Sequence, residues 1–232
     1  QPQTIFFSVS GDFEDFKDGI LASSALSYTI GSNQVNVIRY LSAGRALLVG
    51  TTGGEFSVSS TDDAPISPTN TVIRRQSNYG SADIQPVSVG NVTLFVQRAK
   101  RKLRELVFDF NTDSYSAPDM TILAEHITES GIRTITYQQE PDNVVWAVLN
   151  NGKLCGMTYR REEEVVAWHN HDIAGSFTGV HAINSPTSQT YDYGIVESVA
   201  VLPSELDEDD LFIIVKRTIG GTTKRFIERF NF

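Results

Sequence analysis

Short apolar runs separated by turns recur along this chain, and the stretch Asn143–Asp172 shows the pattern most clearly. Its three apolar runs are Val144–Leu149, Leu154–Tyr159 and Val165–Trp168. Runs of this length that are rich in valine, tryptophan, tyrosine and leucine favour strands. The pair Asn151-Gly152 supplies the positive φ angles that a tight hairpin turn requires. With Ile132–Tyr137 just upstream, these runs predict one sheet of four consecutive antiparallel strands.

Four copies of this unit can be aligned on the second strand of each. The copies begin at Arg45, Val92, Val144 and Leu211, and the strands that precede them are Val35–Leu41, Ile84–Val89, Ile132–Tyr137 and Val196–Leu202. Each copy reaches a valine just before its turn, at Val49, Val96, Val148 and Val215. The predicted turns contain Gly53-Gly54, the basic segment Arg98–Lys102, Asn151-Gly152 and Gly220-Gly221. Repeats of about 40–50 residues with four strands each are typical of β-propeller blades.

The predicted fold class is therefore all-β, in a single domain that spans residues 1–232. We predict a β-propeller of about four or five four-stranded antiparallel blades. The alternative is a β-sandwich with long loops, which would have a similar number of strands.

Two features outside the four copies complete this prediction. The N-terminal segment supplies two more strands, Thr4–Val9 and Leu26–Ile30, whereas the last copy has only three. Because a closed ring leaves no exposed edge, we expect the N-terminal strands to complete the last blade. The one helix expected is Met120–Ile127, with Asp119 or Thr121 as its N-cap.

The bulk composition limits the class of protein. With 232 residues, of which 40% are hydrophobic and 20% charged, the chain can bury a sizeable core. No apolar run approaches the roughly 20 residues that span a bilayer, so we expect no membrane anchor. The net charge of −9 argues against a general duplex-DNA binder, which needs a basic face, but suits a channel wall that DNA slides past. Because the chain starts at Gln1, we expect it to be processed or part of a longer one.

The sequence offers little for catalysis. Cys155 is the only cysteine, which excludes an internal disulfide, and inside a predicted strand a thiol is a small hydrophobe. The densest set of possible metal ligands is His169 and His171, which share one face of a strand, with His181 further along. A metal-dependent enzyme that uses these histidines is one alternative; in the plainer interpretation the imidazoles hydrogen-bond neighbouring loops. We expect no enzyme activity and no cofactor.

Two clusters of like charge are candidate interaction loops. The basic cluster at one hairpin tip consists of Arg98, Lys100, Arg101, Lys102 and Arg104. The acidic cluster consists of Glu205, Asp207, Glu208, Asp209 and Asp210. Clusters of this kind are usually solvated turns. The functional hypothesis is that they meet across a subunit boundary, where opposite charge sets register and partner choice.

Several segments also resemble one family of virion proteins. They are SNQVNVIRYL, the run from Arg74 to Arg98, YQQEPDNVVWAV, VVAWHNHD, ESVAVLP and VKRTIGGTTKRFIE. These segments resemble the tail tubular or nozzle (hub) proteins of short-tailed phages and prophages, and the resemblance runs over nearly the entire chain. Its most specific parts are the motifs Gln-Ser-x-Tyr-Gly-Ser, Gln-Gln-Glu-Pro-Asp and Ala-Trp-His-x-His.

The resemblance implies a structural component of the virion tail whose central part is a β-propeller. It implies a ring of identical subunits below the portal and adaptor, through which DNA leaves as cargo, with adaptor and fibre proteins as partners. Such a protein assembles in the bacterial host cytoplasm and has no catalytic residues to carry over. Family members are considerably longer, so this chain would correspond to the propeller part.

An alternative from the binding class is a glycan-recognising propeller. Its exposed aromatic side chains, such as Tyr79, Tyr191 and Tyr193, would stack on sugar rings.

Overall fold

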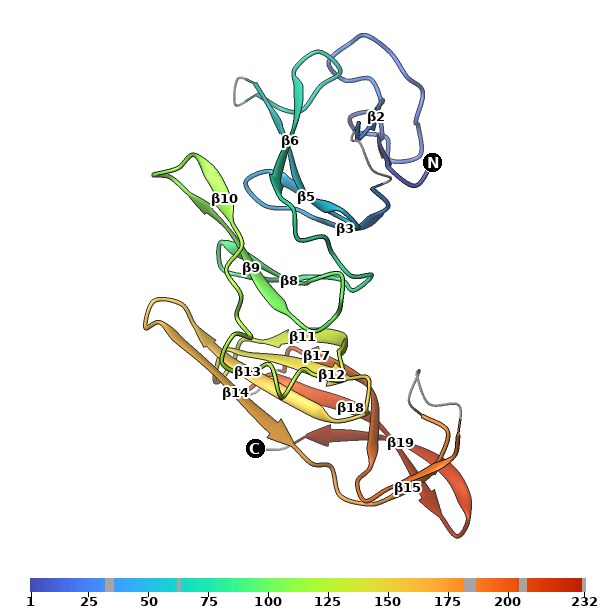
Figure 1. Cartoon of the computed structure of the whole chain (residues 1–232). Coiled ribbons are helices and arrows are strands. Elements are labelled where there is room, and N and C mark those ends of the chain that lie inside the picture. The colour runs from blue at the N-terminus through green and yellow to red at the C-terminus, as the bar shows by residue number, and fades with distance from the viewer. Residues whose placement is uncertain (32–35, 62–63, 182–186, 205–207, 231–232) are drawn as a thin grey trace.

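A computed structural model describes residues 1–31, 36–61, 64–181, 187–204 and 208–230 of the chain. Within these residues the fold is all-β, as predicted, with strands and turns but no helix. Successive antiparallel sheets follow one another in an open row (Figure 1). The N-terminal strands lie at one end of the row and the C-terminal hairpin lies at the other.

Four of the sheets follow the predicted repeat. The first sheet contains β3 (Ile38–Ser42), β4 (Leu47–Thr51), β5 (Gly54–Ser60) and β6 (Thr71–Ser77). The second contains β7 (Val87–Val89), β8 (Val92–Val96), β9 (Leu103–Asp109) and β10 (Ser114–Ser116). The third contains β11 (Ile132–Gln138), β12 (Val144–Leu149), β13 (Leu154–Arg160) and β14 (Val165–His171). The fourth contains β17 (Ile195–Leu202), β18 (Asp210–Ile219) and β19 (Thr222–Phe230).

Two short strand pairs lie outside these four sheets. They are β1 (Thr4–Phe7) with β2 (Leu26–Thr29), and β15 (Phe177–Gly179) with β16 (Gln189–Tyr191). The prediction that the N-terminal strands complete the last sheet is wrong, because β1 and β2 pair with each other. Their apolar side packs instead on the first sheet, where Ile5 shares a core with Val49 and Phe56.

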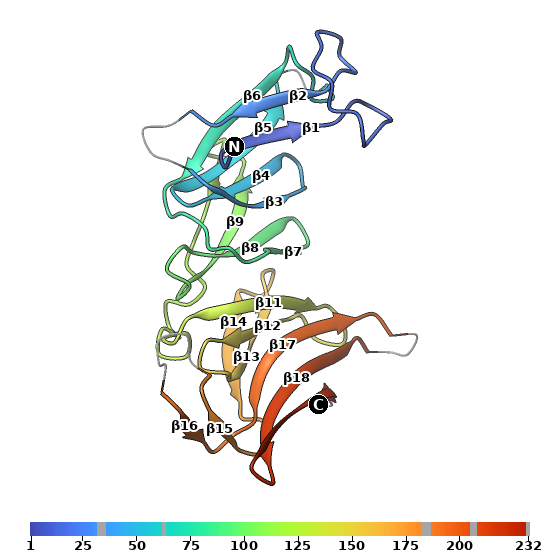
Figure 2. The ribbon, with the colours of Figure 1, turned by 90° about the vertical axis from the view of Figure 1, so that its right-hand side faces the viewer.

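Continuous apolar runs form strands here because both faces of the inner sheets are buried. In β12, Val145, Ala147 and Leu149 belong to the core shared with the second sheet. The alternate residues Val144, Trp146 and Val148 belong to the core shared with the fourth sheet. Neighbouring sheets follow one another along the row (Figure 2), and each adjacent pair shares one core. This arrangement differs from the β-sandwich alternative, in which two sheets share one core.

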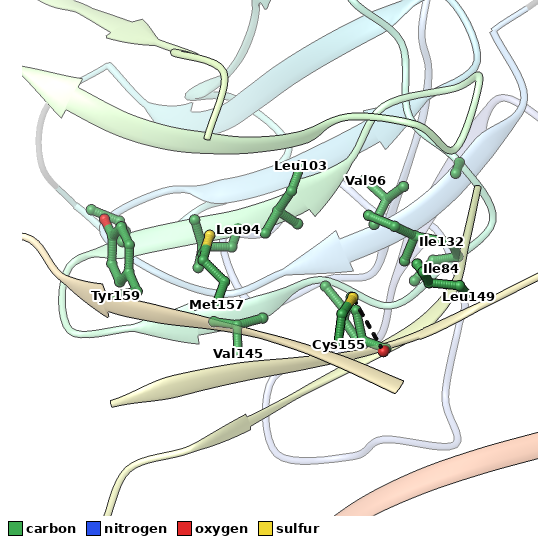
Figure 3. Packing of buried hydrophobic residues seen from close by; sticks show 14 of the residues in the cluster. Ile84, Leu94, Val96, Leu103, Ile132, Val145, Leu149, Cys155, Met157 and Tyr159 are labelled. Carbon is green, nitrogen blue, oxygen red and sulfur yellow. Dashed lines mark hydrogen bonds between the residues drawn. The ribbon is translucent and has the colours of Figure 1, made fainter. Parts of the chain in front are cut away.

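The core between the second and third sheets also holds the lone cysteine (Figure 3). Its labelled apolar residues include Leu94, Val96, Leu103, Val145, Leu149 and Met157. The Cys155 thiol donates to the Ala147 carbonyl at 3.6 Å. Burial raises the pKa of this thiol to about 12, so it is a neutral hydrophobe rather than a nucleophile.

Two of the predicted turns have the expected backbone chemistry. Gly220 and Gly221, between β18 and β19, have φ angles of 59° and 75°, the left-handed values that a two-residue type I′ turn requires. Gly152, between β12 and β13, has a φ of 84°, and its N–H donates to the Leu149 carbonyl at 2.9 Å.

The predicted helix at Met120–Ile127 is wrong, because this segment forms successive turns. The Ala124 N–H donates to the Thr121 carbonyl at 2.8 Å, a bond of one turn only. Asp119 does accept from the Thr121 N–H at 2.9 Å, as an N-cap would. The segment has apolar residues at helical spacing, but eight residues are too few for a helix that is stable without packing along one face. In the fold the burial is irregular instead, with Thr121 fully buried and Leu123 92% exposed.

Candidate assembly surfaces

The basic cluster lies at the tip of the β8–β9 hairpin, as the sequence predicts. Lys100 has a φ of 64°, and its N–H donates to the Gln97 carbonyl at 2.7 Å, which closes the turn. The Lys100 carbonyl accepts from the Ile132 N–H at 2.6 Å, so the tip is tied to the start of the third sheet. Arg98 and Arg101 are exposed at this junction and present their charge to solvent.

Two of the five cations of this cluster are used inside the molecule. Lys102 forms an ion pair with Asp119 at 2.7 Å, and its pKa is raised by this bond. Arg104 is buried and donates to the Ala117 carbonyl at 2.6 Å, while its guanidinium carbon lies 3.4 Å from the centre of the Tyr79 ring. The cations of this tip that could contact a partner are therefore Arg98, Lys100 and Arg101.

In the acidic cluster, Asp209 holds two sheets together. Its Oδ2 accepts from the backbone N–H groups of Gln139 and Glu140 at 3.0 and 3.1 Å. The Asp209 carbonyl accepts from Gln138 Nε2 at 3.0 Å, and Gln138 Oε1 accepts in turn from Trp146 Nε1 at 2.8 Å. These bonds connect the end of β11 in the third sheet to the segment that enters β18 in the fourth. We call this set the Asp209 clasp.

The remaining acidic residues have different environments. Asp210 forms an ion pair with Arg229 at 2.7 Å, and Glu208 is exposed. Glu205 and Asp207 lie outside the described residues. Within the described part of the chain, no ion pair joins the acidic cluster to the basic one. Their pairing across a subunit boundary stays a prediction.

We expect Asp209→Ala to lower the free energy of unfolding by about 1–2 kcal/mol, because two backbone donors lose a charged acceptor. The matched control is Glu208→Ala, which removes the same charge from an exposed neighbour and should change stability by less than about 0.5 kcal/mol. Urea denaturation followed by far-UV circular dichroism measures both. Equal effects of the two substitutions would mean that the clasp does not stabilise the fold.

The three histidines do not form one site. His169 and His171 are neighbours on β14, with Nδ1 of the first 2.6 Å from Nε2 of the second. Their rings pack against Trp146, and burial lowers the pKa of both. His181 lies elsewhere, with its Nδ1 3.4 Å from Lys216 Nζ. Within the described residues, no group of three or more His, Cys, Asp or Glu side chains could hold a metal ion.

The three tyrosines considered for sugar stacking are also divided. Tyr79 is 42% exposed, but Arg104 covers one face of its ring. Tyr191 and Tyr193 meet edge to face at 5.7 Å between ring centres, and Tyr191 also stacks on Phe177 at 6.1 Å. Each of these rings therefore already has a partner within the protein.

Glu55 in β5 is a buried carboxylate that the sequence analysis did not identify. It is 0% exposed, and its side chain accepts hydrogen bonds from the hydroxyls of Ser77 and Ser81. Ser77 ends β6, and Ser81 lies in the segment that connects the first sheet to the second. Burial raises the pKa of Glu55 even though these bonds favour the charged form. The signal in the sequence for a buried carboxylate was one acidic residue inside a predicted strand in which apolar residues alternate.

Replacement of Glu55 by glutamine is expected to change how stability depends on pH. Because the folded pKa lies above the ordinary value of 4.5, the folded state holds the proton more tightly than the unfolded state. The contribution of Glu55 to stability therefore falls as pH rises from 4.5 through the raised pKa. The glutamine variant lacks this fall, so its stability deficit relative to the wild type should shrink or reverse over that window.

The measurement is the free energy of unfolding of both proteins at several pH values, from about 4.5 to about 7. Glu162→Gln removes the same charge from an exposed turn and controls for net charge. A deficit of Glu55→Gln that stays constant across the range would contradict the raised pKa.

Glu105 in β9 is a second buried carboxylate, and it connects the second sheet to the third. Its Oε2 accepts from the Tyr159 hydroxyl at 2.6 Å, and its Oε1 accepts from Arg161 Nε at 2.8 Å. The Glu105 side chain is 7% exposed, whereas that of Arg161 is 50% exposed. Tyr159 and Arg161 also line a cleft of about 620 Å³ together with Asn91 and Asn143. The cleft is lined by the β7–β8 turn of the second sheet and by turns and strand ends of the third.

Comparison of the sequence with protein-family models and with curated proteins gives no match. Within the described residues, no helix has the length and apolar character needed to cross a membrane.

The three most specific motifs of the resemblance all lie where sheets meet. Gln76–Ser81 supplies the serines that bind Glu55 of the first sheet, and its Gly80 carbonyl accepts from the Arg98 N–H of the second sheet's hairpin at 2.9 Å. Gln138–Asp142 supplies the groups held by the Asp209 clasp. In Ala167–His171, the two imidazoles pack with Phe230 of the fourth sheet around Trp146. These motifs therefore join sheets, and none of them converges on a common cleft.

Proposed function

We propose that this chain is a structural module of a phage tail, similar to the propeller part of a nozzle or hub protein. In this proposal it forms an oligomeric ring around the channel through which DNA leaves the virion, and it catalyses no reaction. The observation that carries the proposal is the position of the three resembling motifs, each of which fixes one sheet against the next. Residues that serve rigidity in this way suit a protein that acts by assembly.

The arrangement of the sheets supports the propeller part of the proposal. Each of the four sheets follows a simple meander order, and β11 lies against both β7 and β17, the first strands of the adjacent sheets. First strands that meet on one side of successive sheets are what blades around a common axis require. We therefore propose that the four sheets are propeller-like blades, which a single chain arranges in an open row.

The charges are compatible with DNA as passing cargo. The net charge is −9, and the exposed cations of the basic cluster are restricted to one hairpin tip. A net negative charge repels the phosphate backbone, so DNA can pass without being retained. The tip itself is suited to a local contact with another subunit or with phosphate groups.

The test is to purify tailed particles from a phage or induced prophage that encodes this chain. Mass spectrometry of the particles, and gold-labelled antibody seen by electron microscopy, should both place it in the tail. Deletion of the gene should yield heads that lack a complete tail. Infectious particles that contain no copy of this chain would refute the proposal.

A further inference from the structure

The fourth sheet is the last in the row. The β15–β16 pair packs on one end of its outer face, where Phe177 lies over buried Lys216, and the residues toward the other end of the strands are more exposed. Leu211, Ile213 and Val215 of β18 point into the core shared with the third sheet. The alternate residues Phe212 and Ile214 point to the outer face. Ile227 pairs with Ile214 across the β18–β19 ladder and is 76% exposed. An apolar strip of this kind on a sheet face is typical of a contact surface.

The charged groups that this outer face presents to solvent are mainly arginines. Arg225 is paired with Glu197 at 2.6 Å, and Arg229 is paired with Asp210 at 2.7 Å. The two arginine side chains are 60% and 48% exposed, whereas both carboxylates are only 20% exposed. The guanidinium groups therefore lie outermost. The face presents apolar surface bordered by positive charge.

The opposite end of the row presents the complementary chemistry. The loop 11–21, which follows β1, contains four carboxylates and one lysine. The same loop carries four large apolar side chains that are 84%, 54%, 89% and 68% exposed, namely Phe13, Phe16, Ile20 and Leu21. An acidic and apolar loop of this kind fits an apolar face that is bordered by arginines.

We propose that the outer face of the fourth sheet binds the N-terminal loop and the β1–β2 pair of a second copy of this chain. The two surfaces lie at opposite ends of the row, so one molecule presents both without joining them (Figure 2). A contact between different surfaces of identical chains is head to tail, and it closes into a ring or continues as a filament. The inference deepens the proposed function, on which its biological role rests, because it names the surface through which subunits of the ring would meet.

The stacking already present within the chain shows how such a contact would form. Each inner sheet is covered on both faces by its neighbours, and Ile5 of the β1–β2 pair already covers one face of the first sheet. The outward residue Phe6 on that pair is 56% exposed. Docking of one copy on the next would therefore extend the same series of sheet-on-sheet contacts across the subunit boundary.

The test uses two variants of the full chain, each with one surface blocked. Ile227→Glu places a charge in the apolar strip, and the double variant Phe13→Ser with Ile20→Ser removes the apolar contacts of the loop. All three positions are exposed, so the substitutions should leave the fold intact. Sedimentation velocity over a range of concentrations should show association of the wild type and at least about tenfold weaker association of each variant alone.

The decisive step is to mix the two variants. Because each retains the surface that the other lacks, the mixture should form one-to-one dimers and nothing larger. Leu123→Glu, at a position that is 92% exposed elsewhere, is the control and should associate as the wild type does. Added salt should weaken all of these associations.

Several outcomes would overturn the inference. They are a wild type that stays monomeric, variants that associate as tightly as the wild type, and a mixture that forms no dimer. Scattering data that show the single chain closing on itself would also overturn it. If the particles contain the chain but the purified chain is monomeric, only this contact is refuted. If the purified chain forms dimers but is absent from the particles, only the proposed function is refuted.

Discussion

Trp146→Ala is expected to lower the free energy of unfolding by about 3–5 kcal/mol. Trp146 is 0% exposed and lies in the core shared by the third and fourth sheets. Its ring centre is 5.1 Å from that of His171 and 5.7 Å from that of Phe230, so its removal opens a cavity between two sheets. Its Nε1 also donates to Gln138 Oε1 at 2.8 Å, and the variant leaves this buried acceptor without that donor. A loss of this size is a large part of the stability of a typical domain.

The second tryptophan of the chain provides a control for this prediction. Trp168 on β14 is only partly buried, with its Nε1 donating to the Met120 carbonyl at 2.8 Å, so Trp168→Ala should cost less. Trp146→Phe keeps most of the volume and should recover much of the loss. Far-UV circular dichroism in urea measures all three, since tryptophan fluorescence changes with the substitutions themselves. A Trp146→Ala variant as stable as Trp168→Ala would show that this core does not hold the two sheets together.

Glu105→Ala is expected to lower the free energy of unfolding by about 2–3 kcal/mol. The Tyr159 hydroxyl would lose its acceptor while the residue is only 2% exposed. Burial and the bond to Glu105 both raise the pKa of Tyr159, so the phenol remains a donor that needs a partner. Arg161 is half exposed and can be hydrated instead, which keeps the loss below that of a fully buried ion pair.

A double-mutant cycle separates the Tyr159 bond from the rest of the network. Tyr159→Phe alone removes the donor and leaves Glu105 with Arg161. If the bond is stabilising, Glu105→Ala should cost less in the Tyr159→Phe background than in the wild type. Glu162→Ala, at an exposed position of the adjacent turn, should be nearly neutral. Strict additivity of the two substitutions would rule out an energetic coupling between Glu105 and Tyr159.

The strands were largely predictable because their signal is local. The bounds predicted for β12 are those observed, and Gly220-Gly221 forms the predicted turn. Both follow from neighbouring residues, namely an apolar run buried on two faces and glycines that accept left-handed φ angles. The short polar strands, such as β10 with the sequence SYS, carry no such signal and were not predicted.

The contacts between sheets were not predictable, because they join residues far apart in the chain. Glu105 meets Tyr159 across 54 residues, and the Asp209 side chain meets the Gln139 N–H across 70. An acidic residue in a loop, or a single one in a strand, is compatible with solvent exposure as well as with burial. Only the fold decides which occurs. The expected ring closure failed for the same reason, since Ile5 could bury equally well against any apolar sheet and does so on the first.

The serial arrangement of cores has a consequence for cooperativity. Each core involves only adjacent sheets, so the free energy of the molecule is close to a sum of nearest-neighbour terms, as in solenoid proteins. Fraying should begin at the two termini and advance inward one layer at a time, with the middle of the row opening last. Any ligand or subunit that caps a terminal layer would then raise the protection of every layer behind it.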